Sequence, residues 1–252
     1  MKNKVFQLCC IALCCHYTLF SQQVTVAVAA NVQFVMTELK NSFEKETGIH
    51  VNIVLGSSGK LTAQIREGAP YDVFISADTF YPLSLYRQHL AADSPRVYAQ
   101  GVLVLWTARK DLHLSADLRL LRNVTIKKIA LANPRLAPYG VAAEEALQKA
   151  GVFAAVNNKL VYGENIAQTN QYILSLAADA GFTAKSVVLS DAMKGRGTWV
   201  EVDPASYSPI EQAAVLLRRG KEKNPGPSQQ FYRFLYSGTA QSIFRKYGYL
   251  VN

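Results

Sequence analysis

The hydrophobic pattern of this chain alternates between short strand-like runs and longer stretches with helical spacing. Residues 24–28 alternate and are rich in β-branched side chains, which predicts a strand, and the apolar positions that follow recur at helical spacing up to Gly48. Further strands are predicted at 51–55, 71–76, 128–132, 159–162 and 185–189, and helices at 61–66, 79–90, 141–150, 167–178, 229–236 and 239–247. This order predicts an α/β fold with mostly parallel sheets flanked by helices.

Two apolar runs do not fit this alternation. Residues 101–106 form a continuous apolar run, which is typical of a strand buried on both faces, and residues 213–217 could run back beside it. Since the strand–helix pattern occurs once on each side of the first run, we expect two lobes joined by a two-strand hinge. Lobe I would comprise 22–99 and 207–252, and lobe II would comprise 100–206.

Small and polar residues stand where the predicted strands lead into helices. Four such junctions carry Ala30-Asn31, Ser57-Ser58, Tyr139 and Asn165-Ile166. Tyr139 is predicted to stand just before its helix. The first N–H groups of a helix lack intrahelical partners and carry partial positive charge, so they hold anions without charged side chains. Ligands of α/β sheets bind outside the carboxyl ends of the strands. Because two junctions come from each half, we expect them to enclose a small oxyanion.

Asn31 and the loop at 56–60 also have plainer interpretations. Asparagine is a favoured helix cap, so capping alone accounts for Asn31. The loop suggests a nucleotide-binding P-loop, but its glycine spacing is wrong and Leu61 follows Lys60 where Ser or Thr is required. We therefore reject ATP binding at this loop.

The chain is basic but its charges are scattered. There are 27 Lys and Arg against 18 Asp and Glu, a net charge of +9. The densest basic run, 218–223, is interrupted by Gly220 and Glu222, and we interpret it as a solvated turn. No basic stripe interleaved with aromatic residues appears, which argues against nucleic-acid binding. Asp72 and Asp78, at either end of a predicted strand, suit turn or capping roles.

The four cysteines all lie within the first fifteen residues, in an apolar run that follows two lysines. This layout predicts a secretory signal at 1–21, cleaved after Ser21, and a periplasmic protein without cysteine. The run is short for a transmembrane span, which disfavours an uncleaved anchor. A lipid-attached cysteine is the other alternative, and it is disfavoured because Leu13 stands where lipoprotein signals place a small residue.

Catalytic chemistry is not indicated by the histidines. Beyond the predicted signal only His50, His89 and His113 remain, and all three fall in stretches typical of the surface. None has a spacing suited to a zinc site or to a serine–histidine pair. We therefore expect a binding protein that is not an enzyme.

Taken together, these motifs resemble the periplasmic molybdate-binding proteins of ABC importers, which are two-lobed (type II) periplasmic binding proteins. The motifs that carry the resemblance are Ala29-Ala30-Asn31, the sequences from Gly56 to Leu61, from Gly68 to Asp78, from Ala132 to Gly140 and from Gly163 to Thr169, and Phe244 to Tyr249. They keep their order over nearly all of the chain after the predicted signal. The resemblance implies an inner-membrane ABC permease as partner, a monomer, and no cofactor besides the transported ligand.

The resemblance also implies a set of ligand-binding residues. These are Asn31 and Ser58 from lobe I and Tyr139 and Ile166, through its backbone N–H, from lobe II, with Ala30, Ser57 and Asn165 as further candidates. The chain departs from the family at two points. Many relatives have Ser at the position of Asn31, and many use a tyrosine from the segment that here reads 186–189 and contains none. Tyr139, where some relatives have Ala, could compensate for that loss.

The ligand implied is molybdate, together with tungstate. Near neutral pH molybdate is an unprotonated dianion, so it accepts hydrogen bonds and donates none, and a site made of donors suits it. Phosphate carries a proton and requires an acceptor, but no junction has an Asp in a ligand position, although Glu164 lies near one. Sulfate also lacks the proton and stays an alternative. Ferric ion is the more distant one, because iron sites need clustered tyrosines and carboxylates.

Overall fold

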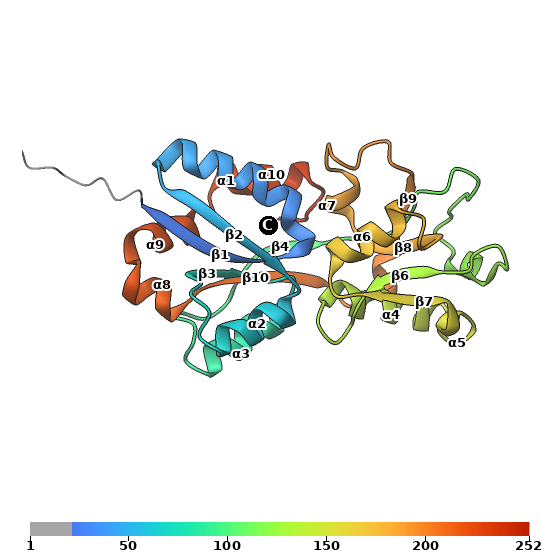
Figure 1. Ribbon diagram of the computed structural model, residues 1–252, viewed down its shortest axis with the longest axis horizontal. Helices are drawn as coiled ribbons and strands as arrows, with labels where there is room; N and C mark the ends of the chain where they lie inside the picture. Colours follow the sequence, from blue (N-terminus) through green and yellow to red (C-terminus); the bar gives the residue numbers. More distant parts are fainter. Residues whose placement is uncertain (1–21, 252) are drawn as a thin grey trace, which may run out of the picture.

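The computed structural model describes residues 22–251, which form two five-stranded sheets lying side by side along the longest axis of the molecule (Figure 1). The first sheet has the order β2 (His50–Gly56), β1 (Gln23–Ala29), β3 (Val73–Ile75), β10 (Ile210–Leu216) and β4 (Arg96–Gly101). The second has the order β7 (Leu160–Gly163), β6 (Ile129–Ala132), β8 (Ala180–Ala184), β5 (Leu103–Thr107) and β9 (Thr198–Glu201). The predicted two-lobed α/β architecture is confirmed, and we call the part built on the first sheet lobe I and the other lobe II.

Each sheet combines parallel and antiparallel pairs in the same way. The strands linked through helices pair in parallel, β1 with β2 and β3 in lobe I, and β6 with β7 and β8 in lobe II. In lobe I, β10 pairs antiparallel with β3 and β4, and in lobe II β5 pairs antiparallel with β8 and β9. The carboxyl ends of the parallel strands therefore lead into the junction loops.

Helices cover both faces of the sheets. Lobe I carries α1 (Gln33–Thr47), α2 (Ser58–Arg66), α3 (Phe80–Arg87), α8 (Arg218–Lys223), α9 (Pro225–Phe234) and α10 (Gly238–Lys246), and lobe II carries α4 (Pro138–Lys149), α5 (Phe153–Val156), α6 (Ile166–Leu174) and α7 (Lys185–Val188). Short 3₁₀ turns are η1 (Ala30–Val32), η2 (Leu118–Arg122), η3 (Asn157–Lys159) and η4 (Pro204–Ser206). Because side chains of a strand alternate, Val26 and Val28 pack into one core and Ala27 into another on the opposite face.

The prediction of one continuous strand over residues 101–106 was wrong. It is divided at Val102, so that β4 ends at Gly101 in lobe I and β5 begins at Leu103 in lobe II. The strand predicted at 213–217 corresponds to β10, which pairs with β4 and not with 103–106. Both halves of the run are buried, so the hydrophobic pattern contains no mark of the crossing between the sheets.

Three other local predictions were wrong. Residues 185–188 form helix α7 and not a strand, because the preceding segment 180–184 takes the strand position in the sheet. Residues 218–223 form helix α8 and not a turn. Helix α4 begins at Pro138, so Tyr139 lies inside its first turn and not before it, consistent with the preference of proline for the first helical position.

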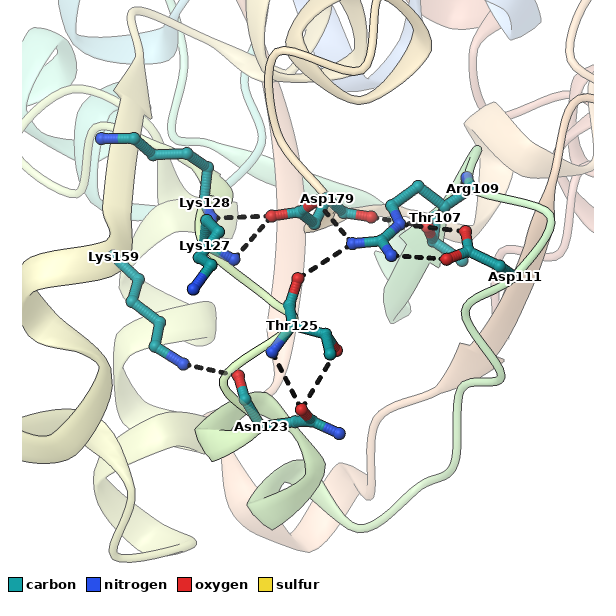
Figure 2. A network of polar contacts seen from close by, with 9 residues as sticks. All are labelled: Thr107, Arg109, Asp111, Asn123, Thr125, Lys127, Lys128, Lys159 and Asp179. Carbon is teal, nitrogen blue, oxygen red and sulfur yellow. Dashed lines mark hydrogen bonds and ion pairs between the residues drawn. The ribbon is translucent and has the colours of Figure 1, made fainter.

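A polar network fixes the long connection between β5 and β6 (Figure 2). Asp179 accepts hydrogen bonds from the backbone N–H groups of Lys127 and Lys128, at 2.6 and 2.9 Å, and from Arg109 at 2.7 Å. Arg109 also donates to Asp111 and to the carbonyl oxygen of Thr125. These contacts hold a connection with little regular structure against the entry to β6.

The predicted signal at 1–21, with all four cysteines, lies outside the described residues. Among residues 22–251, no helix combines the length and apolar character needed to cross a bilayer.

Candidate functional site

The four predicted junctions come together between the two lobes. The turn η1, which contains Asn31, contacts both α6 and α7 of lobe II. The first turn of α2 meets the loop before α4, where the Gly59 N–H donates to the carbonyl oxygen of Leu136 at 2.9 Å. Six of the seven candidate residues are at most 3% exposed, namely Ala30, Asn31, Ser57, Ser58, Tyr139 and Ile166, and Asn165 is half-buried.

The two serines of lobe I are held at the start of α2. Ser57 caps the helix, its Oγ accepting a hydrogen bond from the N–H of Lys60 at 3.3 Å. Ser58 is the first helical residue, and its Oγ accepts from the N–H of Ala77 at 3.0 Å, just beyond β3. Within the described residues neither hydroxyl donates to a protein group. The proton of each hydroxyl is therefore available for a further hydrogen bond.

Asn31 does not cap a helix, so the capping interpretation was wrong. It lies inside η1, and neither η1 nor α1 has a side-chain cap. Its Nδ2 donates to Oε1 of Gln212 at 2.8 Å and approaches the hydroxyl of Tyr249 at 3.3 Å. The side chain is therefore hydrogen-bonded to residues that lie 181 and 218 positions away in the chain. Local sequence cannot show such partners.

Tyr139 enters the same cluster from lobe II. Its hydroxyl accepts a hydrogen bond from Nε2 of Gln212 at 3.0 Å. Burial raises the pKa of Tyr139 well above the usual value for tyrosine, and the nearby Tyr249 adds to this shift. The phenol therefore stays protonated at any physiological pH. In the part of the chain that the structure describes it donates to no protein group.

Two hydroxyls that were not predicted complete the surroundings of Asn31. Oγ of Ser186 on α7 donates to the carbonyl oxygen of Asn31 at 2.9 Å, and the hydroxyl of Tyr249 lies 3.1 Å from the same Oγ. Segment 186–189 lacks a tyrosine, but Tyr249 from the C-terminal segment brings a phenol to this cluster. Tyr249 belongs to the C-terminal motif, Phe244 to Tyr249, that contributes to the family resemblance. That motif was the one sequence feature that could have pointed to Tyr249 as a site residue.

Ile166 and Asn165 have separate roles at the start of α6. Asn165 is the helix cap, and its Oδ1 accepts from the N–H of Gln168 at 3.1 Å. Ile166 is the first helical residue, so its N–H belongs to the group that has no intrahelical acceptor. The backbone of Ile166 is thus suited to an anion, whereas the side-chain oxygen of Asn165 already has a donor.

Three contacts close the lobes over this cluster. Besides the Gly59–Leu136 hydrogen bond, Tyr81 donates to the carbonyl oxygen of Arg135 at 3.1 Å, and Nζ of Lys60 pairs with Glu164 at 3.0 Å. The ion pair is exposed, so its contribution to stability is small. It does place a positive charge beside the carboxylate of Glu164, which lies next to the junction at Asn165.

Comparison with known proteins agrees with this geometry. Residues 24–250 match the family described as "Bacterial extracellular solute-binding protein". The chain is 38% identical to the molybdate-binding protein ModA of Azotobacter vinelandii over 228 residues, covering 90% of this chain and 89% of that protein. It is 37% identical to ModA of Rhodobacter capsulatus, covering 90% and 88%. The chain belongs to the ModA family of solute-binding proteins.

The solved structure of the periplasmic molybdate-binding protein of Azotobacter vinelandii superposes on this ModA-family chain with a TM-score of 0.85, at 33% identity over 91% of this chain and 99% of that one. The family resemblance inferred from the sequence motifs is thereby confirmed. The individual ligand residues stay predictions.

A buried carboxyl group in this ModA-family chain makes stability depend on pH. Burial raises the pKa of Asp78 from 3.8 to about 6, although hydrogen bonds from Ser76 and the N–H of Tyr81 oppose the shift. A pKa raised in the folded state favours folding below pH 4, and this stabilisation is lost as the pH rises through about 6.

We expect the Asp78→Asn variant to lose this dependence. Between pH 4 and pH 7 its free energy of unfolding should rise relative to that of the wild type by up to about 3 kcal/mol. Urea denaturation of both proteins across this range measures the difference. Parallel stability–pH curves for the two proteins would contradict the prediction.

Proposed function

We propose that this chain binds molybdate or tungstate between its lobes in the periplasm and delivers it to the permease of an ABC importer. The observation that carries the proposal is the set of three buried hydroxyls, on Ser57, Ser58 and Tyr139. Each accepts a hydrogen bond from a protein N–H and keeps its own proton. An unprotonated dianion only accepts hydrogen bonds, so it matches this arrangement. The names of the two ModA relatives support the choice of anion.

The expected energetics agree with capture of a dilute anion. A hydrogen bond to a charged group contributes about 1.5–3 kcal/mol net, so several of them, with helix N-termini from both lobes, reach micromolar or tighter affinity after ordering costs. The nearby Glu164 pairs with Lys60, which limits its repulsion of the anion.

Closure of the lobes follows from the division of the donors. We propose lobes of 22–101 with 207–252 and of 103–206, with the first boundary later than the 99/100 expected from the sequence because β4 continues to Gly101. The chain crosses between the lobes at Val102 and again between β9 and β10. Neither lobe alone satisfies the anion, so the ligand stabilises the closed state through contacts that the open state lacks. In this proposal the chain acts as a monomer, converts no substrate and uses no cofactor, and the permease recognises the closed form.

Isothermal titration calorimetry with molybdate, tungstate, sulfate and phosphate tests the proposal. We expect tight binding of molybdate and tungstate, and much weaker binding of phosphate. Binding of sulfate or phosphate without binding of molybdate would overturn it. Visible colour on adding ferric ion, together with no detectable binding of any of the four anions, would favour an iron-binding protein instead.

Ser58→Ala removes one of the proposed donors. We expect molybdate affinity to fall about 10- to 100-fold, since one charge-assisted hydrogen bond is lost. Ser237→Ala is the matched control, because Ser237 caps α10 through the N–H of Ala240, away from the site. It should lower stability and leave affinity unchanged, and equal affinities of the two variants would remove Ser58 from the site.

A further inference from the structure

Gln212 links Asn31 of lobe I to Tyr139 of lobe II, and it was not predicted from the sequence. It lies on β10 and is fully buried. Its Oε1 accepts hydrogen bonds from Nδ2 of Asn31 and from the hydroxyl of Tyr98, both at 2.8 Å. Its Nε2 donates to the hydroxyl of Tyr139 at 3.0 Å. One side-chain amide therefore connects Asn31 in lobe I with Tyr139 in lobe II.

The orientation of this amide is fixed by the amide of Asn31. The hydroxyl of Tyr98 has one proton and two acceptors within reach, Oε1 of Gln212 at 2.8 Å and the carbonyl oxygen of Ser76 at 3.0 Å, so it selects neither orientation. Reversing the Gln212 amide alone would turn its NH₂ group toward the NH₂ group of Asn31, and the hydrogen bond from Nδ2 to Oε1 would be lost. Nε2 therefore points toward Tyr139.

The backbone leaves room for this contact at the crossing between the lobes. A Cβ atom built on Gly101 would collide with the hydroxyl of Tyr139 and with Nε2 of Gln212. The pairing of β10 with β4 also shifts register between Gln212 and Ala213. The absence of a side chain at 101 thus permits the hydrogen bond that joins Gln212 to Tyr139.

We propose that Gln212 is a positioning residue that makes the Tyr139 hydroxyl donate to the bound oxyanion, and thereby favours unprotonated oxyanions over protonated ones of equal charge. The inference rests on the proposed function. With one lone pair of the phenol occupied by Nε2, its proton is directed away from Gln212. Molybdate accepts a hydrogen bond from the phenol, whereas the protonated oxygen of hydrogen arsenate is itself a donor and would need an acceptor at this position.

The Gln212→Glu variant tests the direction of the Tyr139 proton. An ionised carboxylate cannot donate, so Tyr139 must turn its proton toward residue 212 and offer a lone pair to the ligand. Because burial raises the pKa of a carboxyl group at this position, calorimetry on the full chain is carried out from pH 7 to pH 9.5, and we expect the molybdate affinity to fall at least about 30-fold as the new carboxyl group ionises. The preference for molybdate over hydrogen arsenate, measured by competition, should fall at least about 10-fold. Both anions carry two negative charges, so repulsion by the new carboxylate cancels in this ratio.

Gln148→Glu is the charge-matched control, because Gln148 is exposed on α4, the helix that carries Tyr139. Its affinity and preference should equal those of the wild type. An unchanged preference in Gln212→Glu over the whole of this pH range would overturn the inference. It would mean that the amides of Gln212 and Asn31 are both reversed, with Tyr139 already donating to Gln212.

A double-mutant cycle that introduces no charge gives a second test, which also serves if Gln212→Glu does not fold. Gln212→Met should lower molybdate affinity about 3- to 10-fold in the wild type and less than about 2-fold in the Tyr139→Phe background, because it acts through the Tyr139 hydroxyl. Additive effects would overturn the inference.

If the wild type bound no molybdate, the proposed function itself would fail. If the wild type bound it and the variants behaved additively, the role of Gln212 alone would fail.

Discussion

Replacing Gly59 by valine is expected to lower molybdate affinity by more than about 100-fold. Gly59 is the second residue of α2 in lobe I, and its N–H donates to the carbonyl oxygen of Leu136 in lobe II. A Cβ atom there would lie 2.7 Å from the Tyr81 hydroxyl and 3.1 Å from Cα of Leu136, so valine holds the lobes apart. The donors of lobe II then fail to reach the anion, and losing two charge-assisted hydrogen bonds costs about 3–6 kcal/mol.

Gly226→Val is the matched control for this experiment. Gly226 is also the second residue of a helix, α9, and a Cβ atom on it would meet nothing within 4 Å. Calorimetry should give wild-type affinity for this variant. Small-angle scattering of Gly59→Val with saturating molybdate should show no compaction, and full affinity in that variant would show that closure at α2 is not needed for binding.

Asp72→Ala is expected to lower the free energy of unfolding by about 2–4 kcal/mol. The carboxylate of Asp72 is 3% exposed, pairs with Arg219, and accepts hydrogen bonds from the N–H of Thr25 at 2.9 Å and from Asn224 at 3.1 Å. It fastens α8 and the start of α9 to β1 and β3. Alanine leaves a buried N–H without an acceptor and Arg219 without its partner, which accounts for the size of the effect.

Asp93→Ala is the comparison for this stability measurement. Asp93 pairs with Lys221 on the same helix α8, but at 3.8 Å and with both side chains largely exposed. Urea denaturation should show a change within about 0.5 kcal/mol for this variant. Equal losses for the two variants would mean that the buried contacts of Asp72 contribute nothing beyond a surface ion pair.

The candidate site was predictable where its chemistry is local. Ser57 and Ser58 follow a strand and open a helix, and Asn165 precedes Ile166 at another helix start, so sequence order alone placed them at junctions. Sequence reasoning did not identify three residues of the cluster, which are Ala77, Gln212 and Tyr249. Each belongs to a segment that looks, from its own sequence, like a buried strand or a chain end.

Asn31 shows why a residue at a strand–helix junction can be given the wrong local role. Asparagine before a helix is a good cap in any isolated segment, and sequence contains nothing against that role. In the folded chain the partners of its side chain are on β10 and beyond α10. A short-range rule therefore gave way to long-range hydrogen bonds donated by Nδ2 in a buried region.

By itself the sequence determined the order of strands and helices, the two α/β lobes and the junctions rich in hydrogen-bond donors, because periodicity, helix-start residues and turn residues act over a few positions. Only the tertiary structure decided where the apolar run at 101–106 divides between the sheets, that α7 is a helix, and that Gln212 connects Asn31 to Tyr139. These features depend on which segments share a sheet or a buried cluster. Burial and hydrogen bonding between residues far apart in the chain set them, and no local pattern records those partners.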